Sequence, residues 1–506
     1  MTAAGPSHPD DRQRVRIIIG VLIAMLLAAL DQTIVTPAVA TMGKSLGGQG
    51  YLFWIVSAYF LTATAVTPLY GKLADIHGRR PVLLAGIGIF VAGSVAAALA
   101  PDMPWLILAR ALQGVGGGGL IAMAQTVIGD LVPAKERGRF AVYISGTWAI
   151  ASIAGPILGG VIAEHLHWSV IFWLNLPLAA LAIAMTNRNL KFAPWQKREH
   201  SLDILGAILI VGATVALMLG LTLGGAGHGW LAPTVTGPIA VSALLGLVFA
   251  WHVRRAAEPL IPLDVLRNSV VLFATLSVFF AMAAFIGLIV YVPLFLELAH
   301  GLTPSEAGLA LVGYMIGTVA GANAAARSMA HVTHYRRMPV IGLAVSAAAL
   351  AVLAVFASVI DFWVVEGLLI VIGLGSGAQF PVTTVATQNA VDPRDMGVAT
   401  GVLGFLRALG SAIGVAVIGA IGSAAGVGNA LVMHAGGPAA RETIPAASDV
   451  AQRFSPVFWA AALSLLLALA LLSRMPERPL RGRAEMQAAR EADPDDTLTG
   501  VGSSHG

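Results

Sequence analysis

The stretch Gly71-Lys72-Leu73-Ala74-Asp75-Ile76-His77-Gly78-Arg79-Arg80 lies between two apolar segments, residues 51–72 and 82–100. Gly71 permits helices to approach closely, and Gly78 permits a tight turn. Asp75 is an acid among bases at the end of an apolar segment. An ordinary basic loop in water would need no such fixed frame, so the stretch is interpreted as a structured connection between two membrane-spanning helices.

The composition is that of an integral membrane protein. Hydrophobic residues make up 57% and charged residues 11% of the 506 residues, whereas an ordinary soluble domain has about 25% charged residues. The chain contains no cysteine, which excludes disulfides, thiol chemistry and thiolate metal sites. The formal net charge of +4 requires no nucleic-acid partner.

Apolar windows of about 20 residues predict fourteen spans. They lie near residues 17–42, 51–72, 82–100, 104–128, 139–163, 168–187, 203–223, 234–253, 269–297, 305–327, 338–359, 363–388, 397–422 and 455–474. The first apolar run is too long for the core of a signal peptide, so we expect it to be retained as a span.

The basic residues support this prediction. With the N-terminus in the cytoplasm, the outer loops hold only three of the 30 basic residues, Lys44, Arg441 and Arg453. Such a bias predicts the orientation of a membrane protein, here with both termini cytoplasmic. A missed or additional span would reverse every later loop and remove the pattern.

We expect an all-α integral membrane protein made of two six-helix bundles and two inserted helices. The predicted parts are a cytoplasmic tail (1–16), an N-terminal bundle (17–187), an inserted pair with basic flanking loops (188–268), a C-terminal bundle (269–474) and a disordered cytoplasmic tail (475–506). Glycine-rich fourth and fifth spans recur as the twelfth and thirteenth. Repeated halves that meet near the middle of the bilayer are typical of transporters.

Asp31 lies inside the apolar stretch 17–42, where an ionisable group costs a few kcal/mol or more. Either its carboxylate binds a proton or a cation, or it makes a polar contact between helices. At a rise of about 1.5 Å per residue, Asp31 and Arg110 lie at nearly the same depth, whereas Glu366 lies nearer the outside and Arg407 near the midplane. We therefore expect Asp31 to pair with Arg110, although Arg110 could instead extend to the outer surface.

Several motifs carry a family resemblance. The decapeptide at 71–80 resembles the signature loop of the major facilitator superfamily. Arg110-Ala111-Leu112-Gln113-Gly114 matches its Arg-x-x-Gln-Gly signature, and Gly155-Pro156-Ile157-Leu158-Gly159-Gly160 matches the Gly-Pro-x-x-Gly-Gly pattern of its exporters. With Leu30-Asp31-Gln32-Thr33, Trp173-Leu174-Asn175-Leu176-Pro177 and Arg407-Ala408-Leu409-Gly410, these motifs resemble the fourteen-span drug:proton antiporters, the EmrB/QacA-type multidrug exporters.

The resemblance implies the major facilitator fold and proton-coupled efflux of amphiphilic, above all cationic, drugs across the cell inner membrane by alternating access. The residues expected to couple protons and substrate are Asp31, Arg110, Gln113, Glu366 and Arg407. The residues expected to serve packing and gating are Gly71, Asp75, Gly78, Arg79, Arg80, Arg139, Gly155, Pro156, Gly159 and Gly160. Asp75, assisted by Arg79 and Arg139, should tie the two halves together where the thirteenth span begins, near Gly397.

The expected energy source is the proton motive force, with no cofactor, because no phosphate-binding loop of the Walker type is present. No metal site is expected, since His165 and His167 are interpreted as solvated residues of a short loop. The expected partners are amphiphilic small molecules, protons and the lipid bilayer, and an accessory periplasmic partner stays open.

Three alternatives to a multidrug exporter remain at this point. A dedicated exporter of one metabolite, lipid or antibiotic would share every motif. An uptake symporter is disfavoured by the Gly-Pro-x-x-Gly-Gly pattern. An enzyme or scaffold is disfavoured because no catalytic cluster is recognisable and because a scaffold does not explain Asp31.

Overall fold

The computed structural model describes residues 11–47, 52–189, 203–225, 229–256, 259–302, 304–329, 332, 334–392, 395–427 and 447–480. These described residues form helices and no strand. The predicted tail lies outside the described residues from position 481 onward, as does most of the loop between 423 and 454.

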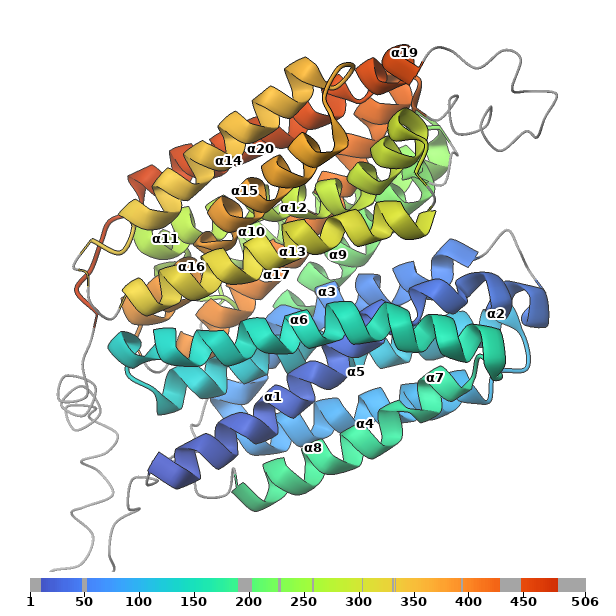
Figure 1. Cartoon of the computed structure of the whole chain (residues 1–506). Coiled ribbons are helices and arrows are strands. Elements are labelled where there is room, and N and C mark those ends of the chain that lie inside the picture. Colours follow the sequence, from blue (N-terminus) through green and yellow to red (C-terminus); the bar gives the residue numbers. More distant parts are fainter. Residues whose placement is uncertain are drawn as a thin grey trace, which may run out of the picture.

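The N-terminal bundle contains the helices of the first six predicted spans (Figure 1). They are α1 (Asp11–Ile34), α3 (Leu52–His77), α4 (Arg79–Ala98), α5 (Met103–Leu131), α6 (Ala134–His165) and the pair α7 (Val170–Trp173) and α8 (Asn175–Asn189). The short elements η1 (Thr36–Ala38) and α2 (Val39–Leu46) follow α1.

The C-terminal bundle contains the helices of the last six predicted spans. They are α12 (Ser269–His300), α13 (Pro304–Ser328), α14 (Arg337–Phe356), the pair α15 (Phe362–Gly377) and α16 (Gln379–Ala390), α17 (Met396–Ala424) and α20 (Ser455–Arg474). The short helix α19 (Ala447–Arg453) precedes α20.

The inserted pair consists of α9 (Ile204–Gly225) and α10 (Pro233–Val253), followed by the short α11 (Leu263–Arg267). Helix α9 packs against α3 and α17. Asp203 fixes one end of the pair, since its carboxylate accepts hydrogen bonds from Gly206 N–H (2.8 Å) and Leu260 N–H (3.1 Å) and lies 2.8 Å from His252 Nε2.

Among the described residues, thirteen helices are long and apolar enough to cross a membrane. The 26-residue helix α3 occupies the place of the remaining predicted span and packs against α5 and α17. The chain is therefore a multi-pass membrane protein with the predicted order of helices.

Three predicted spans are interrupted by breaks that the apolar windows did not reveal. The first ends at Ile34, before Pro37, and the others break at Leu174 and Ala378. Proline lacks an N–H group, so Pro177 and Pro381 cannot donate to the carbonyls four residues earlier, and Pro37 disfavours a helical residue before it.

Each bundle has its own core. The largest buried apolar cluster runs from Val270 to Leu480 within the C-terminal bundle, and the next runs from Ile17 to Ala182 within the N-terminal bundle. Two separately packed bodies can move against each other without repacking their interiors.

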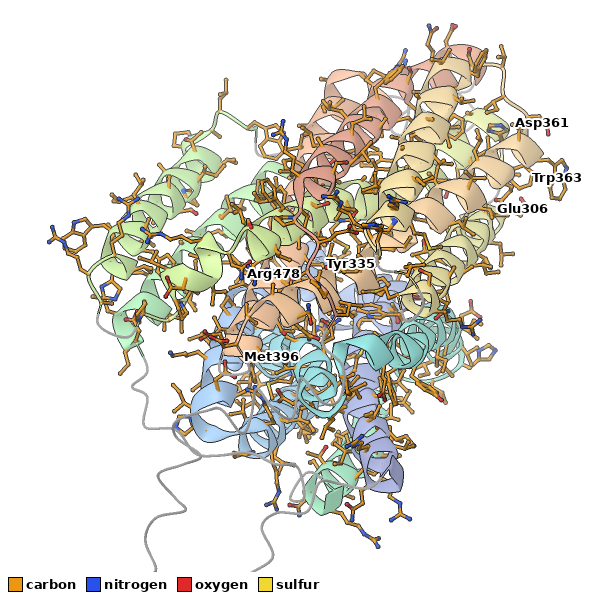
Figure 2. All side chains as sticks on the ribbon, turned by 90° about the vertical axis from the view of Figure 1, so that its left-hand side faces the viewer. Glu306, Tyr335, Asp361, Trp363, Met396 and Arg478 are labelled. Atoms are coloured by element: carbon orange, nitrogen blue, oxygen red, sulfur yellow. The ribbon has the colours of Figure 1, made fainter. Side chains whose placement is uncertain are left out.

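The two ends of the molecule differ. We call the end where α1 begins and α20 ends the termini side, and the end where α2 and α19 lie the far side. Helices α6 and α13 are close on the termini side and separate toward the far side (Figure 1). Figure 2, seen from the termini side, shows Glu306, Asp361 and Trp363 together at one edge of the C-terminal bundle and Tyr335, Arg478 and Met396 nearer the middle of the view.

Candidate functional site

Asp31 and Arg110 form an ion pair in the interior of the N-terminal bundle. The Asp31 Oδ2 and Arg110 Nη1 atoms are 2.6 Å apart, and the two side chains are 0% and 1% exposed. The predicted pairing is therefore confirmed, and Arg110 does not extend to the surface.

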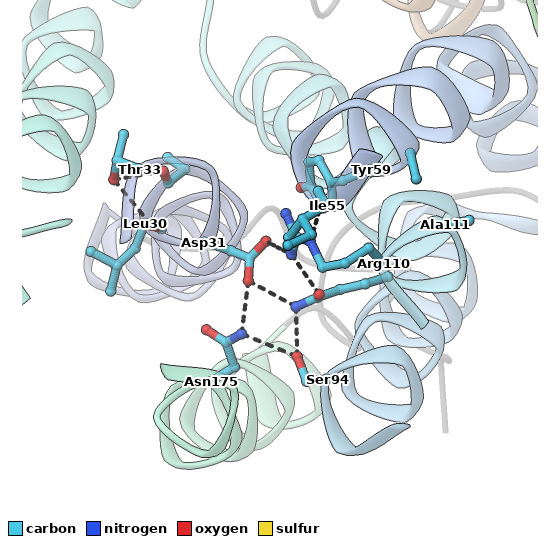
Figure 3. A network of polar contacts seen from close by, with 12 residues as sticks. Leu30, Asp31, Thr33, Ile55, Tyr59, Ser94, Arg110, Ala111 and Asn175 are labelled. Carbon is cyan, nitrogen blue, oxygen red and sulfur yellow. Dashed lines mark hydrogen bonds and ion pairs between the residues drawn. The ribbon is translucent and has the colours of Figure 1, made fainter. Parts of the chain in front are cut away.

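Three further side chains complete a network around the carboxylate (Figure 3). Gln113 Nε2 donates to Asp31 Oδ1 (2.8 Å) and to Ser94 Oγ (2.7 Å). Asn175 Nδ2 donates to the same two acceptors, at 3.0 and 3.1 Å. Asp31 thus has direct partners on α5 and α8, and Ser94 of α4 joins Gln113 to Asn175. The break before α8 places Asn175 beside Asp31.

Arg110 also has several interaction partners besides Asp31. Its Nη1 group also donates to Gln113 Oε1 (2.6 Å), and its Nε group donates to the Ile55 carbonyl (3.1 Å). The guanidinium lies 4.6 Å from the centre of the Tyr59 ring and 5.8 Å from that of Phe172. In such a buried network, removing one charge leaves the other uncompensated, which costs about 3–5 kcal/mol.

The Gly-Pro-x-x-Gly-Gly motif of α6 packs against α1 directly beyond Asp31. A Cβ atom on Gly155 would lie 2.0 Å from Thr33 Oγ1, and one on Gly159 would lie 2.2 Å from the Ile34 carbonyl oxygen. Thr33 Oγ1 also donates to the Ala151 carbonyl (2.7 Å). The expectation that these glycines permit close helix packing is confirmed for Gly155 and Gly159, whereas a Cβ atom on Gly160 would meet nothing within 4 Å.

Asp75 joins the two bundles on the termini side. Its Oδ2 atom accepts a hydrogen bond from Val398 N–H (3.0 Å) in the first turn of α17, as the sequence predicted. Arg79 pairs with Asp75 and, through Nε, with Asp130 Oδ2 at 2.7 Å. Gly71 permits this approach, because a Cβ atom there would lie 2.4 Å from the Gly397 carbonyl oxygen.

The other residues predicted for gating do not share the environment of Asp75. Gly78 takes a positive φ of 95°, which fits its predicted role in a tight turn. Arg80 hydrogen-bonds Asn187 of α8 and so stays within the N-terminal bundle. The side chains of Arg139 and Pro156 lie outside the described residues.

A second connection lies beside Asp75. Gln388 Nε2 donates to the Gln125 carbonyl of α5 (3.1 Å) and to Thr400 Oγ1 of α17 (3.2 Å). We call the contacts of Asp75, Gly71 and Gln388 with the opposite bundle the seam. Among the described residues, the seam closes the molecule on its termini side.

Glu366 and Arg407 are not part of the Asp31 network. Glu366 lies near the start of α15, where a Cβ atom on Gly313 of α13 would be 2.7 Å from its Oε2 atom. Arg407 lies in the middle of α17, with its guanidinium 5.6 Å from the centre of the Phe380 ring.

The sequence did not reveal several members of the site. Ser94 is a single hydroxyl in an apolar helix, and Gln388 is one of many polar residues near a helix end. Asn175 belongs to a recognised motif but had no predicted role. Asp130, at the termini-side end of α5, is the one member that could have been predicted from the sequence, as an acidic partner for Arg79.

Two separately packed bundles joined on one side, with a buried ion pair inside one of them, are an architecture typical of membrane transporters. The family model described as Major Facilitator Superfamily matches residues 21–415. This chain belongs to the major facilitator superfamily.

Curated relatives are multidrug transporters. The multidrug transporter protein MdtP of Bacillus subtilis (strain 168) is 33% identical, over 81% of this chain and 75% of its own length. Multidrug resistance protein 3 of the same strain is 31% identical, over 80% of this chain and 79% of its own length. The solved structure of the proton:xylose symporter XylE has a TM-score of 0.64 at 14% identity, with coverage of 95% of this chain and 99% of that chain, which shows the common fold.

Proposed function

We propose that this protein is a proton-coupled multidrug exporter in the cell membrane, with its termini side facing the cytoplasm. The names of the relatives support efflux of several compounds, and the basic bias of the predicted inner loops supports the orientation. The observation that carries proton coupling is the buried Asp31–Arg110 pair. On this proposal the protein is a transporter and not an enzyme.

The pair links protonation to structure. In the described state, Asp31 is 0% exposed and bound by Arg110, Gln113 and Asn175. A proton on the carboxylate would remove the counter-ion of Arg110 and leave a buried charge without compensation. Protonation therefore requires the network to rearrange, and rearrangement of the network changes the affinity of Asp31 for a proton.

The rearrangement has a path to the other bundle. Thr33 and Ile34 follow Asp31 in α1 and contact α6 at Ala151, Gly155 and Gly159. Helix α6 in turn packs against α13 of the C-terminal bundle. Gly155 lies against the short side chain of Thr33, and Gly159 lies against the Ile34 backbone. Because no long, flexible side chain separates the helices at these glycines, a shift of α1 is passed to α6.

The seam selects between the two states. The described state is closed on the termini side, where Asp75 binds the start of α17. Opening of the seam would let substrate enter from the cytoplasm. Closure of the seam would let the substrate leave only toward the far side. Proton entry at Asp31 from the far side, followed by seam opening and proton release, would complete one exchange cycle.

The proton gradient is sufficient for this work. A proton that enters down about 100 mV and one pH unit releases roughly 3.7 kcal/mol. This free energy sustains a gradient of several hundredfold for a neutral substrate. For a monovalent cation the electrical contribution cancels, and only about a tenfold gradient remains.

A substrate-panel efflux assay tests the proposal. Cells that express the protein are loaded with fluorescent amphiphiles, and retention is compared with and without a protonophore. We expect several compounds to be expelled and the protonophore to abolish their efflux. Efflux that continues unchanged when the proton gradient is collapsed would contradict proton coupling, and efflux of a single compound would favour a dedicated exporter.

A further inference from the structure

Arg407 is a cation in the middle of α17 with no carboxylate partner among the described residues. Its position, eleven residues after Met396, is about 16 Å from the start of the helix. Its Nε atom is buried and has no hydrogen-bond partner in the described parts of the chain. The nearest polar contact is long, with Nη2 3.4 Å from Thr384 Oγ1.

Arg110 shows what a fully satisfied arginine looks like in this protein. It binds a carboxylate, an amide oxygen and a backbone carbonyl. Among the residues that the structure describes, Arg407 contacts only Thr384 and, through a long cation–π contact, Phe380. A charge in the middle of a membrane is costly when it is unpaired, so the difference indicates that Arg407 serves a partner from outside the chain.

The position of Arg407 is directly beyond the seam. Thr400 lies seven residues earlier, on the same face of α17, and bonds Gln388. Phe380 and Thr384, which contact Arg407, lie eight and four residues before Gln388, on the same face of α16. Arg407 and its contacts therefore lie about 10 Å from the seam toward the far side, and Arg407 itself is partly exposed.

Aromatic rings extend from Arg407 into the C-terminal bundle. Phe380 packs edge-on against Phe285 of α12, with ring centres 5.8 Å apart. Phe285 lies 5.4 Å from Tyr314 of α13. Phe285 and Phe380 are only half-buried, so they offer ring surface beside a cation.

We infer that Arg407 binds an acidic group of the transported compound and that the substrate class includes amphiphilic aromatic acids. This inference rests on the proposed function as an exporter. The carboxylate or sulfonate would form the charge-assisted hydrogen bonds that Arg407 lacks, and the ring system of the substrate would stack with Phe380 and Phe285. Asp31 offers no comparable site for a cation in the described state, because it is fully buried and bonded.

The charge of the substrate determines how much net charge crosses the membrane in each cycle. If one proton enters while one monovalent anion leaves, the net transfer is two positive charges inward. Exchange of a proton for a neutral compound transfers one positive charge inward, and exchange for a monovalent cation transfers none. Efflux of an aromatic acid should therefore depend more steeply on membrane potential than efflux of its neutral ester.

Equilibrium binding tests the inference without any gradient. The purified full chain is titrated with 1-pyrenebutyrate and with its neutral methyl ester, and probe fluorescence is recorded. We expect Arg407→Gln to weaken binding of the acid roughly 10- to 100-fold and to leave binding of the ester within about twofold. Arg407→Lys, which keeps the charge, should recover most of the affinity for the acid.

Two controls separate the possible outcomes. Arg453→Gln removes a positive charge from α19, where Arg453 binds the Gly426 carbonyl, and should change neither affinity. Asp31→Asn should keep binding of the acid even though coupling is lost, so failure of proton coupling and failure of this inference are distinguishable. Unchanged binding of the acid to Arg407→Gln, or an equal loss for acid and ester, would overturn the inference.

Discussion

Asp75 of α3 accepts a hydrogen bond from the backbone N–H of Val398, 3.0 Å away in the first turn of α17. A loop signature of one bundle is thereby attached to the start of a helix in the other. The start of a helix carries partial positive charge, and Arg79 holds the Asp75 carboxylate from the opposite side. The contact is present in the described state, which is closed on the termini side.

Asp75→Asn should bias the protein toward the state that is open on the termini side. Asparagine can still accept the hydrogen bond, but it loses the charge interaction with the helix start, about 0.3–1 kcal/mol. The resulting shift of roughly two- to fivefold can be read from the alkylation rate of a cysteine at Gly401, which is buried beside the seam.

Asp130→Asn is the matched control, since Asp130 lies on α5 of the N-terminal bundle and bonds the same arginine, Arg79. Asp130→Asn should change the alkylation rate of the cysteine at position 401 less than Asp75→Asn does. If the cysteine at position 401 is alkylated in both variants at the same rate as in the parent protein, Asp75 does not control the seam.

The contact of α6 with α1 can be tested with neighbouring glycines. Gly159→Ala would place a Cβ atom 2.2 Å from the Ile34 carbonyl, whereas Gly160→Ala would meet nothing within 4 Å. We expect Gly159→Ala to separate the helices and reduce efflux about tenfold or more, by analogy with the cost of 1–3 kcal/mol for overpacking. Gly160→Ala should transport normally and gain slightly in helix stability. Equal activity of the two variants would show that this packing does not transmit the motion.

The orientation can be tested on the two ends of α10. The chain has no cysteine of its own, so single cysteines can be placed at Leu231, 92% exposed before α10, and at Arg254, exposed directly after it. An impermeant maleimide added to intact cells should label the cysteine at position 231 and not the one at 254. The reverse pattern would invert the proposed topology.

Much of the fold follows from local pattern. Apolar length and basic loops predicted the order of the helices, because lipid requires each backbone group to be bonded within its own helix. The depth argument for Asp31 and Arg110 succeeded because helical rise is constant. The link from Asp75 to α17 was predictable because helix starts attract acids.

The remaining contacts of the site depend on how the helices pack against one another. The apolar and charge pattern of a single sequence does not show this packing. Asn175 reaches Asp31 because α7 and α8 break beside it, and the break follows from packing as well as from Pro177. Gln388 acquires its role from the register of α16 against α5. From its depth we expected Arg407 near the midplane, and it lies in the middle of α17, but depth alone could not show that it faces Phe380.

Asp31→Asn is the variant at the centre of the account. It keeps the size of the side chain and one acceptor oxygen but removes titration, and it leaves Arg110 charged without its counter-ion. Loss of up to about 3–5 kcal/mol of stability is expected, so the amount and thermal stability of the purified protein must be measured beside transport. Asp31→Glu, which keeps a titratable carboxylate, should retain part of the activity.

The most direct measurement is drug-driven proton movement by purified Asp31→Asn in liposomes that contain a pH-sensitive dye. We expect a drug gradient to move protons through the parent protein, to move fewer through Asp31→Glu and to move none through Asp31→Asn, although the last variant still binds drug. Full drug-driven proton exchange by a folded Asp31→Asn would contradict the claim that this carboxylate couples protons to efflux.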